Sequence, residues 1–276
     1  MYQKVCYIVF NIQNIEFYNA IAKVVKKTVI SYYTSNIITT FVPQHTIAMR
    51  NIAEQKPIVK YTPKEEIANC TTHILGGIIS IVVCCMFLYK GYQTSSTLTL
   101  VSLWLYLFGL LFSYTTSAIY HAYPADKTRG KALIRKLDHT AIYWHIAGCY
   151  SPVTLIAFLN GGATVWGWLI FAFVWLCAIV GTALSFRKMS THSYFETICY
   201  VLMGLTILVA FKPFYNCVGW GVVGWVIAEG ISYISGAVLY SIHKVRYMHT
   251  VFHILIILGD IFHMVAVWNI LSIFGV

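Results

Sequence analysis

The chain has 276 residues, of which 59% are apolar and only 10% are charged. With a mean hydropathy of +0.71, this composition excludes an ordinary soluble globular domain and predicts a membrane protein. The formal net charge of +10 is explained by basic loops that face anionic lipid headgroups, so it gives no reason to expect a nucleic-acid partner.

The sequence predicts no membrane span in the N-terminal quarter of the chain. Its apolar stretch "KVCYIVFNI" (4–12) is too short to cross a bilayer and is flanked by polar residues. We expect residues 1–64 to form an N-terminal cytoplasmic segment and residues 65–276 to form the membrane domain. Met49 is a second candidate for the start of the chain.

Seven apolar runs follow from residue 74 onward, each close to the ~20 residues that a helix needs to cross a bilayer core. The runs are continuous rather than alternating, and they are too long for the strands of a membrane barrel. The sequence therefore predicts an all-α, seven-helix membrane bundle. The predicted spans are 74–89, 98–120, 138–158, 164–184, 194–211, 217–241 and 248–275.

The distribution of Lys and Arg predicts the orientation of these spans, because loops on the cytoplasmic side are enriched in basic residues. Eight of the 19 basic residues precede the first span, and the second, fourth and sixth loops carry most of the others. Only Lys90 and Lys212 fall on the opposite side. We therefore expect a cytoplasmic N-terminus and an external C-terminus.

Polar side chains gather at the predicted cytoplasmic ends of four spans that are remote in sequence. Ionisable groups inside a membrane are costly and by default indicate function. Independent accidents would place such groups at both membrane faces, so their common depth indicates one site. The residues concerned are Glu66, Asn69, His73, Ser117, His121, Asp138, His139, His249 and His253.

The histidines among these residues have the spacing of a metal site. In "HTVFH" (249–253) the two histidines are four residues apart, so they share one face of a helix. Together with His121 they supply three imidazoles, which with one water would form a tetrahedral zinc site of the catalytic kind. Asp138 would orient a ligand or take a proton from the water. Ser117, one turn before His121, would donate a hydrogen bond to a substrate oxygen.

Each of these residues also has a structural explanation when taken alone. A single pair of histidines on a helix is a weak signal, and Ser117 fits a helix-packing residue that bonds to its own turn. Asp138 fits a cap at the start of a helix, where a carboxylate complements the helix dipole. Glu66 and Asn69 fit an ordinary interfacial helix start.

Four further polar residues lie deeper in the predicted spans. Asp260 is seven residues past His253, on nearly the same helix face and about 10 Å deeper, and fits either a second polar element or a proton or ion relay. Glu229 fits a bond to a neighbouring helix as well as a role in the cavity. His145 lies deeper than Asp138, and His263 is too far from His253 to share its ligands.

Four segments resemble the motifs of the hemolysin III family, the bacterial branch of the progestin and adipoQ receptor group. They are "EEIANCTTH" (65–73), "SAIYH" (117–121), "LDHTAIYWHIAGCYSP" (137–152) and "HTVFHILIILGDIFH" (249–263). The resemblance implies seven helices around an intramembrane metal site with His121, His249 and His253 as ligands. It also implies that Ser117 and Asp138 accompany them. Asp260 and His145 depart from the family pattern, which has a small uncharged residue and an aliphatic residue at these positions.

The resemblance implies a location in a bacterial cytoplasmic membrane and leaves several functions open. Similar sites in the wider superfamily belong to hydrolases of lipid amides, so we expect a zinc-dependent hydrolase that acts on amide or ester bonds in membrane lipids. The bacterial branch is named after cell lysis, and the alternative is a channel-forming or cytolytic protein, either as one chain or as a homo-oligomer. A sensor of lipid or membrane state is a further alternative.

Overall fold

The computed structural model describes residues 61–94, 96–124, 128–188, 194–242 and 245–275. Within these ranges every regular element is a helix, and no strand is present. The prediction of an all-α protein is confirmed. The predicted N-terminal segment, apart from residues 61–64, and the alternative start at Met49 lie outside the described residues.

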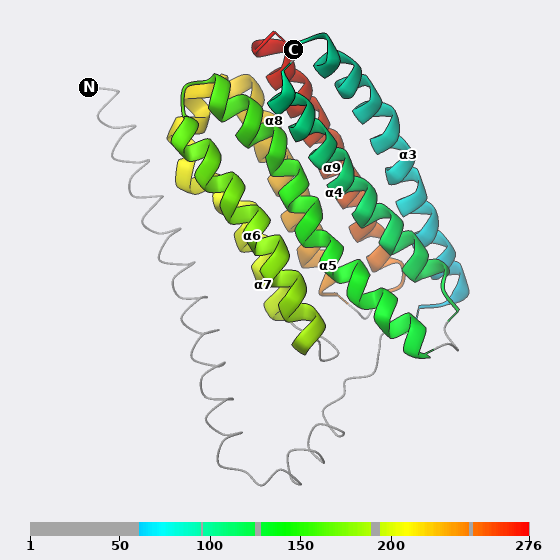
Figure 1. The fold of residues 1–276 in the computed structure, drawn as a ribbon. Helices are drawn as coiled ribbons and strands as arrows, with labels where there is room; N and C mark the ends of the chain where they lie inside the picture. The colour runs from blue at the N-terminus through cyan, green and yellow to red at the C-terminus, as the bar shows by residue number, and fades with distance from the viewer. Residues whose placement is uncertain (1–60, 95, 125–127, 189–193, 243–244, 276) are drawn as a thin grey trace, which may run out of the picture. The chain divides into compact units, whose positions relative to one another are not determined.

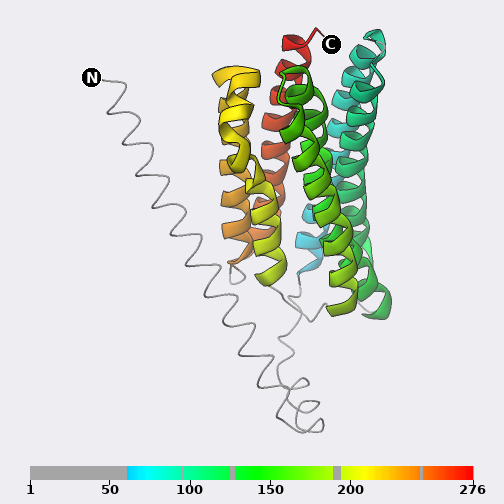
Figure 2. The same ribbon diagram turned by 60° about the vertical axis from the view of Figure 1, so that its left-hand side comes forward.

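The helices lie lengthwise beside one another in a bundle (Figure 1, Figure 2). Helix α3 packs against α4 and α9, α4 packs against α5, and α8 packs against α9. By length and composition, six segments of the described chain can cross a membrane. The elements are α3 (Pro63–Gln93), α4 (Thr97–Ala122), α5 (Thr128–Pro152), η1 (Val153–Phe158), α6 (Thr164–Lys188), α7 (Tyr194–Gly204), η2 (Leu205–Ala210), α8 (Phe211–Tyr240) and α9 (Met248–Ile273).

Helix α3 begins eleven residues before the apolar run 74–89 that predicted it. Thr62 and Glu65 form a capping box, in which Glu65 N donates to Thr62 Oγ1 at 3.3 Å and Thr62 N donates to Glu65 Oε2 at 2.8 Å. Pro63 follows as the first helical residue, where its missing N–H has no cost. The first two turns are polar, so hydropathy alone did not reveal them.

Helix α5 also begins before its predicted span. It starts at Thr128, ten residues ahead of Asp138, because the intervening stretch consists mainly of good helix formers although it is basic. The interpretation of Asp138 as a helix cap is therefore wrong. Near its other end α5 contains Pro152, and the next turn, η1, is a π-helix whose six residues are all buried. Proline lacks the N–H that an α-helix interior needs, and a wider turn is one way to absorb this loss.

The segment from α7 to α8 runs along the bundle and returns. In α7, the Tyr200 hydroxyl donates to the His139 carbonyl at 2.8 Å. Farther along, the Cys217 thiol lies 3.4 Å from the carbonyl oxygen of Gly161. His139 lies in α5 and Gly161 in the turn after η1, so the chain has followed much of the length of α5 and η1 between them.

The return is made by α8. Its last residue, Tyr240, has its ring 5.5 Å from the ring of His249, at the start of α9. Gly219 interrupts α8 with φ 68° and ψ −178°, a conformation open essentially only to glycine. The number of membrane crossings and the side on which each end of the chain lies stay predictions.

Candidate metal centre

Three histidines from two helices that are remote in sequence meet at one end of the bundle. His121 lies in the last turn of α4, while His249 and His253 occupy the first two turns of α9. One ring nitrogen from each falls within 4.8 Å of the other two. His121 and His253 are buried, and His249 is partly buried. These residues, called the three-histidine site below, are the three that the sequence predicted to lie together.

The hydrogen bonds of His253 indicate its tautomer. The Thr72 hydroxyl donates its hydrogen to the carbonyl of Asn69 at 2.8 Å. The same oxygen lies 3.2 Å from His253 Nδ1, so it accepts the hydrogen of that nitrogen. The lone pair of His253 is then on Nε2. A ligating histidine is commonly oriented in this way through its second nitrogen.

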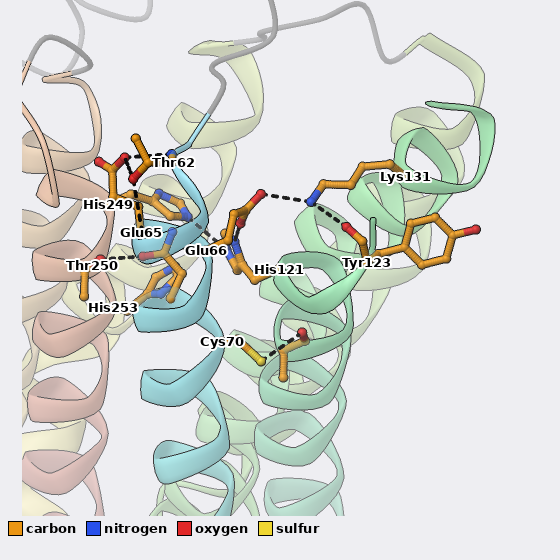
Figure 3. Close-up of polar contacts among 12 residues, drawn as sticks. Thr62, Glu65, Glu66, Cys70, His121, Tyr123, Lys131, His249, Thr250 and His253 are labelled. Carbon is orange, nitrogen blue, oxygen red and sulfur yellow. Dashed lines mark hydrogen bonds and ion pairs between the residues drawn. The ribbon is translucent and has the colours of Figure 1, made fainter. Parts of the chain in front are cut away.

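His121 is held similarly by Glu66 (Figure 3). Its Nδ1 lies 2.6 Å from Glu66 Oε2, and the other carboxylate oxygen of Glu66 accepts a hydrogen bond from Lys131 Nζ at 2.9 Å. Lys131 also donates to the carbonyl of Tyr123 at 3.0 Å. The carboxylate therefore accepts the Nδ1 hydrogen of His121 and leaves the lone pair on Nε2.

Tyr61 covers the outer side of the three-histidine site. Its ring stacks on His249 with 4.9 Å between ring centroids and is tilted against His121 at 6.0 Å. Burial raises the pKa of the Tyr61 hydroxyl, so this group stays neutral at physiological pH.

The donor set fits a zinc ion. His121 Nε2 and His249 Nε2 are 3.3 Å apart, within hydrogen-bond distance when His249 Nε2 carries a hydrogen. Two nitrogens that bind one tetrahedral zinc at ~2.0–2.1 Å would themselves lie about 3.3 Å apart. Three neutral imidazoles also leave a fourth position for another ligand, as in catalytic zinc sites.

The two predicted companions of the histidines lie on the adjacent helices α4 and α5. Ser117 is buried on α4, one turn before His121. Asp138 is partly buried on α5, and its carboxylate is not among the groups within 4.8 Å of all three nitrogens. The neighbouring His139 has its Nδ1 3.6 Å from a carboxylate oxygen of Glu196 on α7.

Helix α3 contributes more to the site than the sequence indicated. Thr72 and Glu66 orient two of the histidines, and Asn69 Oδ1 accepts a hydrogen bond of 2.5 Å from Thr250 on α9. His73 places its ring edge-on to His253, with 3.9 Å between ring centroids. Their common spacing of three to four residues was the available signal, since it predicts a polar stripe on one face of a helix. Thr72, three residues after Asn69, fits the same spacing, but its uncharged side chain was not singled out.

A second polar cluster lies deeper in the bundle, around Asp260. Tyr114 and Tyr233 donate their hydroxyls to this carboxylate, and His145 Nε2 lies 2.9 Å from Asp260 Oδ1. Asp260 is 1% exposed. The Asp260 cluster (Asp260, Tyr114, His145, Tyr233) thus joins one residue from each of α9, α4, α5 and α8. With Cys149 in place of the tyrosines, His145 and Asp260 form another group whose ligand atoms lie within 4.8 Å.

Glu229 and His263 form a separate pair. His263 Nδ1 lies 2.8 Å from Glu229 Oε2, which links α9 to α8. This contact agrees with the interpretation of Glu229 as a residue bonded to a neighbouring helix. It also agrees with the expectation that His263 does not join the three-histidine site.

Comparisons with known proteins place these features in a family context. The sequence model of the haemolysin-III related family matches residues 61–264. Hemolysin-3 of Bacillus cereus is 33% identical over 198 residues, which are 71% of this chain and 87% of that protein. The hemolysin-3 homolog of Bacillus subtilis is 29% identical over 200 residues, or 72% and 91% of the two chains. The human monocyte to macrophage differentiation factor is 24% identical over 216 residues, or 77% and 87%.

Proposed function

The chain belongs to the haemolysin-III related family of integral membrane proteins, and we propose that it is a zinc-dependent hydrolase of amide or ester bonds in membrane lipids. The observation that carries the proposal is the convergence of three imidazoles. Thr72 and Glu66 bond to Nδ1 of His253 and His121, which leaves the Nε2 lone pairs of these two rings for a metal ion. We further propose that the protein crosses the cytoplasmic membrane seven times.

The residues around the site have separate roles in this proposal. A zinc ion held by His121, His249 and His253 would lower the pKa of a water toward ~7 and polarise an acyl carbonyl. Asp138 on α5 would accept the proton that this water gives up. Ser117 on α4 would donate a hydrogen bond to the substrate. Tyr61 would limit the access of bulk water.

The first test is the metal content of the protein. Wild type and His253→Ala are purified in detergent, and zinc per chain is measured by elemental mass spectrometry. We expect about one zinc per wild-type chain and none in the variant, because two imidazoles hold zinc poorly. His139→Ala is the matched control, since it removes a histidine of α5 that bonds to Glu196 instead. Wild-type protein without metal contradicts the proposal.

The second test is turnover. Zinc-loaded protein is incubated with a ceramide in mixed micelles, and the release of fatty acid is measured. We expect Asp138→Asn to lower kcat by at least about a hundredfold, the scale of a lost general base, while its zinc content stays at the wild-type level. Zinc-loaded protein that releases no fatty acid from ceramides, other acyl amides or lipid esters contradicts hydrolysis.

A channel-forming function is the second candidate, and the name hemolysin-3 of two Bacillus relatives favours it. In a single chain the deep polar residues are poorly suited to line a pore, because Asp260 is occupied by Tyr114, Tyr233 and His145. Conductance of liposomes that contain the purified protein tests this function. Ion flux that persists in His253→Ala would favour a pore independent of the three-histidine site.

A further inference from the structure

Two buried polar side chains of α3, one in contact with Thr250 and the other with His253, lack a complete set of hydrogen-bond partners. Asn69 is 0% exposed and His73 is 6% exposed. Among the described residues, Asn69 Nδ2 and both ring nitrogens of His73 have no hydrogen-bond partner. A buried donor or acceptor left unsatisfied costs about 1–3 kcal/mol. Two such groups on one face of a helix, one turn apart, indicate a ligand that completes them.

The orientation of Asn69 is fixed by its other atoms. Its Oδ1 accepts the hydroxyl hydrogen of Thr250 at 2.5 Å, and its backbone carbonyl accepts the hydroxyl hydrogen of Thr72 at 2.8 Å. The amide therefore cannot turn its nitrogen toward Thr250 without losing this bond. The two N–H groups of Nδ2 remain available as donors.

His73 lies beside the three-histidine site but does not belong to its ligand group. Its ring centroid is 3.9 Å from that of His253 and 6.3 Å from that of His121. Its nitrogens are not within 4.8 Å of all three ligand nitrogens. His73 is thus placed to contact a molecule bound at the site rather than to hold the metal.

Other buried histidines of the described bundle show what His73 lacks. His121 bonds to Glu66, His145 to Asp260 and His263 to Glu229. In each case a carboxylate on another helix satisfies one ring nitrogen. No carboxylate or hydroxyl of the described residues does this for His73.

The face of α3 that points away from the bundle is apolar and exposed. Its large aliphatic side chains point away from the bundle and are about half exposed or more, as expected of a helix that contacts lipid. The hydrocarbon phase therefore lies on the opposite side of α3 from the three-histidine site. These residues are Ile67 (66% exposed), Ile74 (51%), Leu75 (52%) and Ile78 (54%).

We propose that Asn69 and His73 are the hydrogen-bonding pair that holds an acyl oxygen of a lipid at the three-histidine site. The ligand class is an acyl chain that ends in a carboxylate, amide or ester, whose oxygen accepts from Asn69 Nδ2 and from one nitrogen of His73. In this proposal α3 binds the ligand oxygen in addition to the hydrogen bond proposed for Ser117. The inference rests on the proposed function only in taking the three-histidine site as a lipid site, and it requires no turnover.

Binding of radiolabelled oleate to the detergent-purified full chain, measured by scintillation proximity, tests the pair. Asn69→Asp keeps the acceptor for Thr250 but replaces the donor with an anion. His73→Leu removes both ring nitrogens, and His73→Gln restores one amide donor. We expect oleate affinity to fall at least about tenfold in Asn69→Asp and His73→Leu, the scale of one lost hydrogen bond to a charged group. His73→Gln should recover part of the loss.

Zinc content and thermal stability are measured on the same samples, and Ser80→Ala is the matched control. Ser80 is a buried residue of α3 whose hydroxyl bonds to the Gly76 carbonyl of its own helix, so its loss should leave oleate affinity unchanged. Weaker oleate binding with wild-type zinc content supports the pair. If wild type holds no zinc but the two variants still bind oleate less well, the pair stands and the hydrolase proposal fails.

Two outcomes overturn the inference. The first is oleate affinity that is absent in wild type or unchanged in both variants, whatever the metal content. The second is loss of zinc from the folded variants, because Asn69 and His73 would then act on the metal itself.

Discussion

Glu66 is the residue on which the orientation of His121 depends. It joins His121 to Lys131 through its two carboxylate oxygens (Figure 3). Lys131 thus holds the carboxylate in place, and the carboxylate orients the imidazole of His121. Outer partners of this kind typically change metal affinity 10–100-fold when they are removed. The sequence placed Glu66 near the site but offered a helix start as its explanation.

We therefore expect Glu66→Gln to lower zinc affinity by about 10–100-fold, as measured by competition with a chromophoric chelator. A neutral amide accepts a weaker hydrogen bond from His121 and loses the ion pair with Lys131. Glu65→Gln is the matched control, since Gln also completes a capping box and Glu65 contacts Thr62 and the Tyr247 N–H rather than a histidine. Equal affinities in the two variants would show that Glu66 does not orient a ligand.

The tautomer of His253 gives a second prediction at this scale. Thr72→Val removes the hydroxyl that accepts from His253 Nδ1, so zinc affinity should fall, by about tenfold at the lower end of such effects. Thr71→Val changes the neighbouring exposed threonine of α3 and should leave the affinity at the wild-type value. The same chelator competition measures both variants.

At the scale of elements, the closeness of α3 to α4 depends on Gly76. A Cβ at this position would overlap the ring of Tyr114, which donates to Asp260. We expect Gly76→Ala to destabilise the protein by about 1–3 kcal/mol, the usual range for overpacking, and to lower the midpoint of thermal aggregation. Gly224→Ala on α8, where a Cβ would contact nothing within 4 Å, should not lower it. If Gly76→Ala is as stable as Gly224→Ala, the ring of Tyr114 can move aside without a loss of stability.

The helices themselves were predicted well where they are apolar and poorly where they are polar. The spans 98–120 and 248–275 agree closely with α4 and α9. The starts of α3 and α5 were missed by about ten residues, because a hydropathy pattern detects contact with lipid and not helix formation. This error mattered for the site, because Glu66 and Asn69 were expected near the histidines but could also be explained as an ordinary helix start, and Thr72 was not singled out.

At the scale of the whole molecule, the buried Asp260 cluster joins four helices. Asp260→Leu would leave Tyr114, Tyr233 and His145 without their acceptor, and we expect a loss of about 3–5 kcal/mol, as when one partner of a buried pair is removed. Thermal aggregation followed by size-exclusion chromatography measures this loss. Asp260→Asn retains an acceptor and should lose less. A stable Asp260→Leu protein with altered liposome conductance would instead favour a pore lined by Asp260.

The predicted orientation is tested by fusions to the C-terminus. An odd number of crossings from a cytoplasmic N-terminus places the C-terminus outside, where alkaline phosphatase is active and green fluorescent protein is dark. We expect this result in bacterial cells. A fluorescent green fluorescent protein fusion and an inactive phosphatase fusion would contradict it. The chain would then cross the membrane an even number of times, as when residues 196–240 form a single crossing, or its N-terminus would lie outside.

The sequence predicted the meeting of His121, His249 and His253 because two kinds of regularity coincided, the four-residue spacing on α9 and the common depth of the span ends. It did not predict the partners of Asp260. Tyr114 and Tyr233 look like ordinary aromatic residues in apolar runs, and periodicity along one helix carries no information about which residue of another helix it meets. The contacts between helices therefore required the structure.

The π-helix η1 is a place where the chain can lose one residue without disturbing the helix around it. A π turn holds one residue more than an α turn over nearly the same rise, so the stretch Val153–Phe158 carries a surplus residue inside the most buried rod of the bundle. Deleting one residue there would return the turn to α geometry and keep the flanking side chains in register. A deletion elsewhere in α5 would rotate every following side chain by about 100°. Among relatives of this protein, single-residue gaps in this span should therefore fall within η1.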